Sequence, residues 1–159
     1  MAKIDMTLAT ETATPNSAER LMADDLVWVG CCGGQAVNER PLPVSVTDGA
    51  CIFRTVMLGA LEQDQRDWRL IGPVGNNDAQ LATLEADLAV TSLLRSTVPS
   101  HVSILPDNIG LPRMQQLHVN LYQRTSQTND IANELANHIR EQFQRRFQAQ
   151  ASPMARKAS

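Results

Sequence analysis

The chain has 159 residues, of which 43% are hydrophobic and 19% are charged, and its formal net charge is −3. A chain of this length can bury about two thirds of its unfolded surface in one domain, and its acidic balance argues against a general nucleic-acid binder. We expect a single cytoplasmic domain at 16–149, a mobile lead-in at 1–15 and a mobile tail at 150–159, with neither a secretion signal nor a membrane span.

The first predicted element is a helix that begins near Asn16. Asn16 and Glu19 resemble a capping box, and the glycine pair at 33–34 would end the helix. The apolar side of this helix would consist of Leu21, Leu26, Trp28 and Val29. A competing interpretation makes 26–30 a short strand, but the helix is favoured.

Three strands are predicted to follow this helix. The segment 42–47 alternates between apolar and polar residues, and 48–49 is the Asp-Gly pair that is typical of a two-residue hairpin turn. The return strand would be 50–58, which is apolar on both faces. A third strand is predicted at 68–71, where the chain stops at a Gly-Pro pair.

A second helix is predicted at 77–96, after a run of helix-breaking residues at 72–76. Its leucines recur at spacings of three and four, and a second apolar side develops toward its C-terminal end. One side can cover a sheet, and the other side needs a further partner. In a chain this small, that partner would be a second copy of the chain.

The last predicted elements are strands at 101–105 and 117–122 and an amphipathic helix at 128–148. Acidic residues begin this helix and arginines end it, which complements the helix dipole. The predicted fold is therefore α+β, with a twisted five-stranded antiparallel sheet and the element order α-β-β-β-α-β-β-α.

The sequence contains no recognisable catalytic, metal or cofactor site. The three cysteines form neither a disulfide framework nor a metal pattern, and Cys31 and Cys32 would lie at a helix C-terminus, where the dipole disfavours a thiolate. The three histidines lack the spacing of zinc ligands, and the loop 72–77 lacks both common phosphate-binding motifs. We expect no catalytic residue, no metal and no cofactor.

The order of the predicted elements resembles the class I type III secretion chaperones, the family that includes the Tir chaperone. The segments that carry this resemblance are 44–49 as the first strand and turn, 68–75 as the third strand, 81–94 as the middle helix and 128–147 as the last helix.

This resemblance implies a non-enzymatic homodimer that binds the N-terminal segments of secreted effectors and keeps them competent for type III secretion. The secretion ATPase would be a further partner, and nucleic acid would not be one. The residues expected to bind the client are Leu21, Val44, Val46, Ile52, Arg54, Val56 and Leu58. The residues expected at the dimer interface are Leu81, Leu84, Leu88 and Thr91.

Two other functions stay open on the sequence alone. One is a structural assembly subunit of a virion or a secretion machine, which would have the same small build without an active site. The other is a small cysteine-dependent enzyme that uses Cys31 or Cys32.

Overall fold

The computed structural model describes residues 5–47, 49, 51–124 and 130–151, and it divides the chain into two compact units. One unit combines the two ends of the chain, Met1–Ala23 and Leu117–Ser159, and the other is Asp24–Gln116. The chain leaves the first unit after residue 23 and returns to it at residue 117, and the expected single domain at 16–149 stays a prediction.

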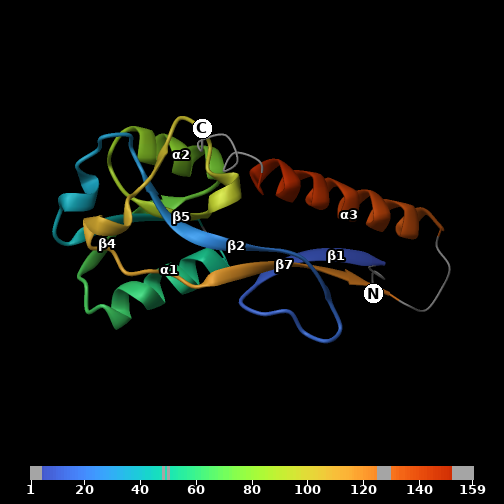
Figure 1. The fold of residues 1–159 in the computed structure, drawn as a ribbon. Coiled ribbons are helices and arrows are strands. Elements are labelled where there is room, and N and C mark those ends of the chain that lie inside the picture. Colours follow the sequence, from blue (N-terminus) through green and yellow to red (C-terminus); the bar gives the residue numbers. More distant parts are fainter. Residues whose placement is uncertain (1–4, 48, 50, 125–129, 152–159) are drawn as a thin grey trace, which may run out of the picture. The chain divides into compact units, whose positions relative to one another are not determined.

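The unit made from the two chain ends is built on an antiparallel strand pair (Figure 1). Strand β1 (Met6–Glu11) pairs with β7 (Gln116–Gln123), and β7 in turn lies next to β2 (Glu19–Gly30) in the sheet order. The expected mobile lead-in at 1–15 thus contains a paired strand. The alternation predicted at 117–122 is confirmed, because the leucines of β7 are buried.

The C-terminal helix α3 (Asp130–Ala151) belongs to the same unit. It buries Ala136, and Arg140 donates from Nε to both carboxylate oxygens of Glu19, at 3.0 and 2.9 Å, which ties the helix to the start of β2. The helix predicted at 128–148 is confirmed from residue 130 onward. Residues 128–129 and the tail from 152 lie outside the described residues.

A closed polar network holds β1 and β7 together beyond their backbone pairing. Asn120, which is fully buried, donates from Nδ2 to Glu11 Oε2 and to the Ala13 carbonyl oxygen, both at 2.8 Å. Tyr122 donates from its hydroxyl to Glu11 Oε2 at 2.7 Å, and Thr14 donates to Asn120 Oδ1 at 2.8 Å. The bonds from Asn120 and then Tyr122 hold the pKa of Glu11 below its ordinary value of 4.5.

This network predicts a pH-dependent contribution to stability. A carboxylate with a lowered pKa stabilises the fold above the pKa of the unfolded chain and loses that effect as the pH falls through its folded value. Glu11→Gln should therefore be less stable than the wild type at about pH 7, and the difference should shrink as the pH falls below about 4.5. Urea unfolding at a series of pH values measures this difference. Glu141→Gln, on an exposed part of α3, is the matched control, and an unchanged difference at low pH would contradict the prediction.

The second unit contains a small parallel sheet. Strand β3 (Leu42–Thr47) pairs in parallel with β4 (Trp68–Val74), and Val90 forms a parallel bridge with Val44 at the other edge of β3. Parallel neighbours need a crossover connection, which is usually a helix. The elements of this part of the chain are β3 (Leu42–Thr47), α1 (Ile52–Gln63), β4 (Trp68–Val74), α2 (Asn77–Glu85) and β5 (Thr91–Leu94).

The two helices of this unit pack on different groups of strand residues (Figure 1). Met57 and Leu61 of α1 pack in a cluster with Trp28, whereas Leu84 of α2 packs in another cluster with Val27 and Val29. Both faces of the C-terminal end of β2 are therefore buried. A strand that is buried on both faces has a continuous apolar run, as residues 26–29 do here.

The structure corrects three predicted elements. The helix predicted at 16–34 is strand β2, so the competing strand at 26–30 was right. The segment 50–58, predicted as a return strand, belongs to helix α1 from Ile52 onward. The partner of β3 is β4, which runs parallel to it, and parallel strands cannot be joined by the hairpin predicted at 48–49. Residues 48 and 50 lie outside the described residues. The helix predicted at 77–96 ends at Glu85, and its second half contains β5.

The other strand predictions are confirmed. The strand predicted at 42–47 is β3, and the strand predicted at 68–71 is β4, which continues to Val74. The segment 101–105 contains the two-residue strand β6 (Ser103–Ile104), which pairs with the end of β2. The fold is α+β, with three α-helices in the part of the chain that the structure describes, but its element order is not the predicted one.

The turn after β2 is fixed by one carboxylate. Asp87 accepts hydrogen bonds from the backbone N–H of Gln35 at 2.6 Å and of Ala36 at 3.1 Å. A Cβ added at Gly34 would lie 2.9 Å from Asp87 Cγ and 2.8 Å from Cys31 Cβ. Neither atom can move freely, because one belongs to the bonded carboxylate and the other adjoins the backbone.

Gly34→Ala should therefore lower the free energy of unfolding by about 1 to 3 kcal/mol, as expected for overpacking. Gly59→Ala is the matched control, because Gly59 lies within α1 and an added Cβ there meets no atom within 4 Å. That control should raise the free energy of unfolding by about 0.5 to 1 kcal/mol. Urea titration of both variants measures these changes. Equal changes in the free energy of unfolding would contradict the conclusion that Asp87 leaves no room for a side chain at residue 34.

Candidate functional site

The strand order of the second unit creates a topological switch point. The chain crosses from β3 through α1 to β4 on one side, and then returns through α2 to β5 on the opposite side of β3. In open parallel sheets, ligands bind at the carboxyl ends of the strands where the direction of crossing reverses. A cavity of about 470 Å³ opens at this place, and it is lined by the carboxyl end of β3 and by the first three residues of the neighbouring β5.

The cavity wall is partly apolar and partly polar. Its apolar side chains come from β3, α1, α2, β5 and the loop after β5, and they are Val46, Phe53, Met57, Leu81, Leu93 and Pro99. Its hydroxyl, thiol, amide and guanidinium groups are those of Thr47, Cys51, Arg54, Asn77, Gln80, Thr91, Ser92 and Thr97. This mixture is typical of a site for a small organic molecule.

The N-terminus of α1 faces this cavity and brings positive potential to it. The N-cap residue, Cys51, makes no side-chain capping bond, and the first helical hydrogen bond runs from the Thr55 N–H to the Cys51 carbonyl oxygen at 3.2 Å. The side chain of Asn76, in contrast, caps α2 by accepting from the Ala79 N–H at 2.9 Å. The uncapped N–H groups of α1 and the guanidinium of Arg54 both favour an anion.

A buried hydrogen-bonded triad fixes the floor of the cavity. Gln80 is 7% exposed and donates from Nε2 to the Ser45 carbonyl oxygen at 3.1 Å and to Thr91 Oγ1 at 3.0 Å. Thr91 Oγ1 also donates to the Ser45 carbonyl oxygen, at 2.7 Å. A carbonyl oxygen can only accept, so the orientation of the Gln80 amide is fixed. Its Oε1 has no partner among the described residues, and it is available to a ligand as an acceptor.

The structure brings few of the predicted client-binding residues together. Arg54 and Val46 line the cavity, whereas Val44 is fully buried in the core and Leu21 belongs to the other unit. The remaining three, Ile52, Val56 and Leu58, lie along helix α1 and not along a strand face.

The residues predicted for a dimer interface are also distributed differently. Leu84 and Thr91 are buried inside the chain, Leu81 lines the cavity and Leu88 is exposed. The first two are therefore not available to a second copy, and self-association itself stays a prediction. Gln80, Thr47 and Ser92 were not predicted as site residues. Thr47 and Ser92 carry the weak signal of hydroxyl residues beside apolar strand residues, and Gln80 on α2 carries none.

The structure gives the remaining candidate groups no common site. Cys31 and Cys32 lie just after β2 and not at a helix end, and all three cysteines are free. Within the described residues, no three His, Cys, Asp or Glu side chains are grouped so that they could hold a metal ion. No helix in the part of the chain that the structure describes is long and apolar enough to cross a membrane.

Comparison with known proteins finds similarity at the level of fold alone. No protein-family model and no curated protein matches the chain. The regulatory domain of HypT from Salmonella typhimurium, in its bromide ion-bound form, matches with a TM-score of 0.65 at 10% identity, over 87% of this chain and 72% of that one. The C-terminal domain of a probable LysR family transcriptional regulator from Rhodococcus sp. RHA1 matches with a TM-score of 0.60 at 14% identity, over 82% and 71%.

A longer protein with the same fold is full-length CbnR, solved in a complex with its target DNA. It matches with a TM-score of 0.53 at 13% identity, and the match covers 88% of this chain. The chain corresponds to 53% of CbnR, so it spans about half the length of that regulator.

These matches overturn the resemblance to type III secretion chaperones. The neighbours include the regulatory domain of HypT and the C-terminal domain of a probable LysR family transcriptional regulator, so the expected chaperone function, effector clients and secretion ATPase are wrong. The exclusion of nucleic acid is corrected as well, because a neighbour with this fold is a DNA-binding regulator. These neighbours are described as a regulatory domain and as the domain of a transcriptional regulator, and the absence of enzymatic activity in this chain stays a prediction.

The Gln80 triad gives a prediction on stability. Gln80→Leu removes two buried hydrogen bonds but leaves the bond between Thr91 and Ser45, so the fold should persist. The free energy of unfolding should fall by about 1 to 3 kcal/mol, as measured by urea titration. Gln63→Leu, at the exposed end of α1, is the control and should have little effect. Equal stability of Gln80→Leu and the wild type would show that the triad does not hold β3, α2 and β5 together.

Proposed function

We propose that this chain is a ligand-sensing regulatory domain of a LysR-type transcription regulator, and that it binds a small organic anion in the cavity at the ends of β3 and β5. The observation that carries this proposal is the position of the cavity at the topological switch point, beside the uncapped N-terminus of α1. The similarity to regulatory domains, one of which is bromide ion-bound, supports the same role.

The chemistry of the cavity selects the class of ligand. Its backbone N–H groups and Arg54 favour negative charge, whereas Phe53, Met57 and Leu81 present apolar surface. A volume of about 470 Å³ lies within the range of roughly 300 to 1,000 Å³ that is common for sites of small organic molecules. The ligand is therefore a carboxylate with an apolar body.

Such a ligand would contact four elements at once. The cavity takes its lining from β3, α1, α2 and β5, so a bound molecule ties together both helices and the two strands that they flank. A ligand that binds one arrangement of these elements better than another shifts the population toward it. This is the elementary requirement of a sensor, and a cytoplasmic location belongs to the same proposal.

The experiment is a thermal-shift and calorimetric screen with benzoate, hexanoate and octanoate as probes. At ten times its Kd, a ligand stabilises the fold by about 1.4 kcal/mol, which raises Tm by about 3 to 6 °C for a chain of this size. Arg54→Gln should weaken binding of the best probe at least tenfold, because it removes the cation from the cavity.

The matched control is Arg69→Gln. Arg69 is half-exposed, pairs with Glu39 at 2.7 Å and lies outside the cavity, so its loss should leave probe binding unchanged. Equal weakening by both variants would indicate a general charge effect. The uncharged benzyl alcohol and hexanol should bind much more weakly than the carboxylates, and equal binding would contradict an anion site.

A further inference from the structure

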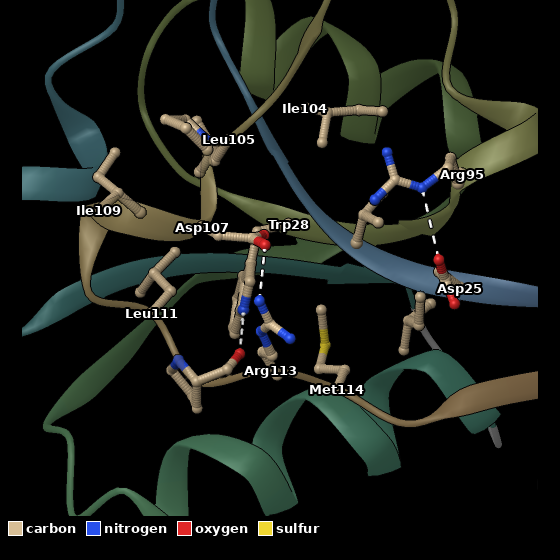
Figure 2. A pocket seen from close by; sticks show the side chains of 14 residues that line it. Asp25, Trp28, Arg95, Ile104, Leu105, Asp107, Ile109, Leu111, Arg113 and Met114 are labelled. Atoms are coloured by element: carbon tan, nitrogen blue, oxygen red, sulfur yellow. Dashed lines mark hydrogen bonds and ion pairs between the residues drawn. The ribbon is translucent and has the colours of Figure 1, made fainter. Parts of the chain in front are cut away.

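A second cavity, of about 230 Å³, lies between β2 and the segment that follows β6 (Figure 2). This segment, residues 105–114, connects β6 with β7 and forms an arch beside β2. The cavity therefore belongs wholly to the second unit, and it shares no lining residue with the cavity at the ends of β3 and β5. Its lining residues are Asp25, Leu26, Val27, Trp28, Arg95, Ile104, Leu105, Pro106, Asp107, Ile109, Leu111, Pro112, Arg113 and Met114.

The arch is held in place at several points, so the cavity is formed before any ligand arrives. The Leu105 N–H donates to the Trp28 carbonyl oxygen at 2.9 Å, and Trp28 Nε1 donates to the Pro112 carbonyl oxygen at 2.8 Å. Arg66 donates to the Gly110 carbonyl oxygen from outside the cavity. Trp28 of β2 and Leu111 of the arch are both buried in one apolar cluster, and together they form part of the apolar floor of the cavity.

Two acid–base pairs lie above this floor, as the dashed lines in Figure 2 show. Arg113 Nη2 donates to Asp107 Oδ2 at 3.0 Å, with side chains that are 85% and 77% exposed. Arg95 Nε lies 3.6 Å from Asp25 Oδ2, and these side chains are about half exposed. Exposed pairs of this kind are weak, so a ligand can replace either partner at little cost.

The charges at this rim match a ligand that itself carries both signs. The two arginines and two aspartates sum to zero, so neither a simple anion nor a simple cation is favoured by net charge. Arg113 donates through one nitrogen only among the described residues, which leaves most of its donors for a carboxylate. The carboxylate of Asp107 can accept from an ammonium group.

The size of the cavity restricts the ligand further. A cavity of about 150 Å³ holds a molecule of benzene, and sites for drug-sized molecules begin at about 300 Å³. We infer that the cavity of about 230 Å³ beneath the two ion pairs is a site for a free amino acid with an apolar side chain. Its carboxylate is held by Arg113, its ammonium group by Asp107, and its side chain lies on the floor formed by Trp28 and Leu111. This site goes beyond the proposed anion sensor and does not depend on it.

Isothermal titration calorimetry on the whole chain tests this site, with L-leucine and L-phenylalanine as probes. At least one of them should bind with a Kd below about 1 mM. For leucine, removal of the amino group gives 4-methylpentanoate and removal of the carboxylate gives 3-methylbutylamine. Each of these should bind at least tenfold more weakly than leucine to Arg54→Gln, because each lacks one of the two charges and this variant weakens carboxylate binding in the other cavity.

Variants locate the binding. Arg113→Gln and Asp107→Asn should each weaken amino-acid binding at least tenfold, and both should fold normally because the two side chains are exposed. Arg69→Gln, which removes an arginine from an ion pair away from this cavity, should bind like the wild type. Arg54→Gln, which changes the other cavity, should also leave amino-acid binding unchanged.

Three results would overturn the inference. No binding heat with either amino acid up to about 10 mM would exclude the site. Binding of 4-methylpentanoate to Arg54→Gln as tight as that of leucine would exclude the zwitterion as the ligand class. Loss of binding in Arg54→Gln but not in Arg113→Gln would place the amino acid in the other cavity, which would leave the proposed function standing without a second site.

Discussion

The parallel pairing of β3 on both of its edges is the constraint on which the site depends. β4 lies on one edge, and Val90 joins the other through two hydrogen bonds of 2.9 Å, one to the Pro43 carbonyl oxygen and one from the Ser45 N–H. Because parallel strands cannot be joined by a tight turn, both connections must be crossovers, and both contain a helix. The helices begin where the strands end, so their N-termini meet at the same edge of the sheet. The cavity, its positive potential and its hydroxyl groups all follow from this pairing.

The same pairing explains which elements could be predicted from the sequence. The strands at 42–47 and 68–74 have short apolar runs bounded by turn residues, and their identity does not depend on the direction of their partner. The segment 52–63 is different, because apolar residues occupy both of its faces in either conformation. Met57 and Leu61 are four residues apart and both are buried, a spacing that belongs to a helix. The Asp-Gly pair at 48–49, which is typical of a hairpin, favoured a strand over 50–58. The parallel direction of the β3–β4 pairing, a long-range property, decides for the helix.

The error at 16–34 has a related cause. A strand buried on both faces reads as a continuous apolar run, and such a run carries no period that separates it from a buried helix. Trp28 packs in the cluster of α1, while Val27 and Val29 pack in the cluster of α2. The sequence could not show these two clusters, because their members come from segments far apart in the chain. The resemblance to secretion chaperones was built on the wrong element order and failed with it.

The candidate site was less predictable than the fold, and the reason is again long-range. Arg54 was singled out as a charge on an apolar strand face, and in the structure it is a charge in the first turn of a helix beside a cavity. Gln80 was not singled out, because a glutamine on a helix is ordinarily a solvated residue. Its importance arises only when β3 and β5 come together and offer the Ser45 carbonyl oxygen and Thr91 Oγ1 as acceptors. Neither acceptor is near Gln80 in sequence, so the signal exists only in the folded chain.

The two cavities differ in how their charges are held, and this difference separates their chemistry. In the cavity at the ends of β3 and β5, the positive potential comes partly from backbone N–H groups at the start of α1, whose positions are set by the helix. In the cavity beneath the arch, each charge is on an exposed side chain that already has a partner of the opposite sign. Backbone dipoles fixed by a helix favour a ligand of negative charge, and they cannot reorient. The arginine and the aspartate of an exposed ion pair can each exchange their partner for a ligand group, so the pair can bind a carboxylate and an ammonium group at once. The first arrangement therefore selects an anion and the second selects a zwitterion, although both cavities combine apolar surface with arginine.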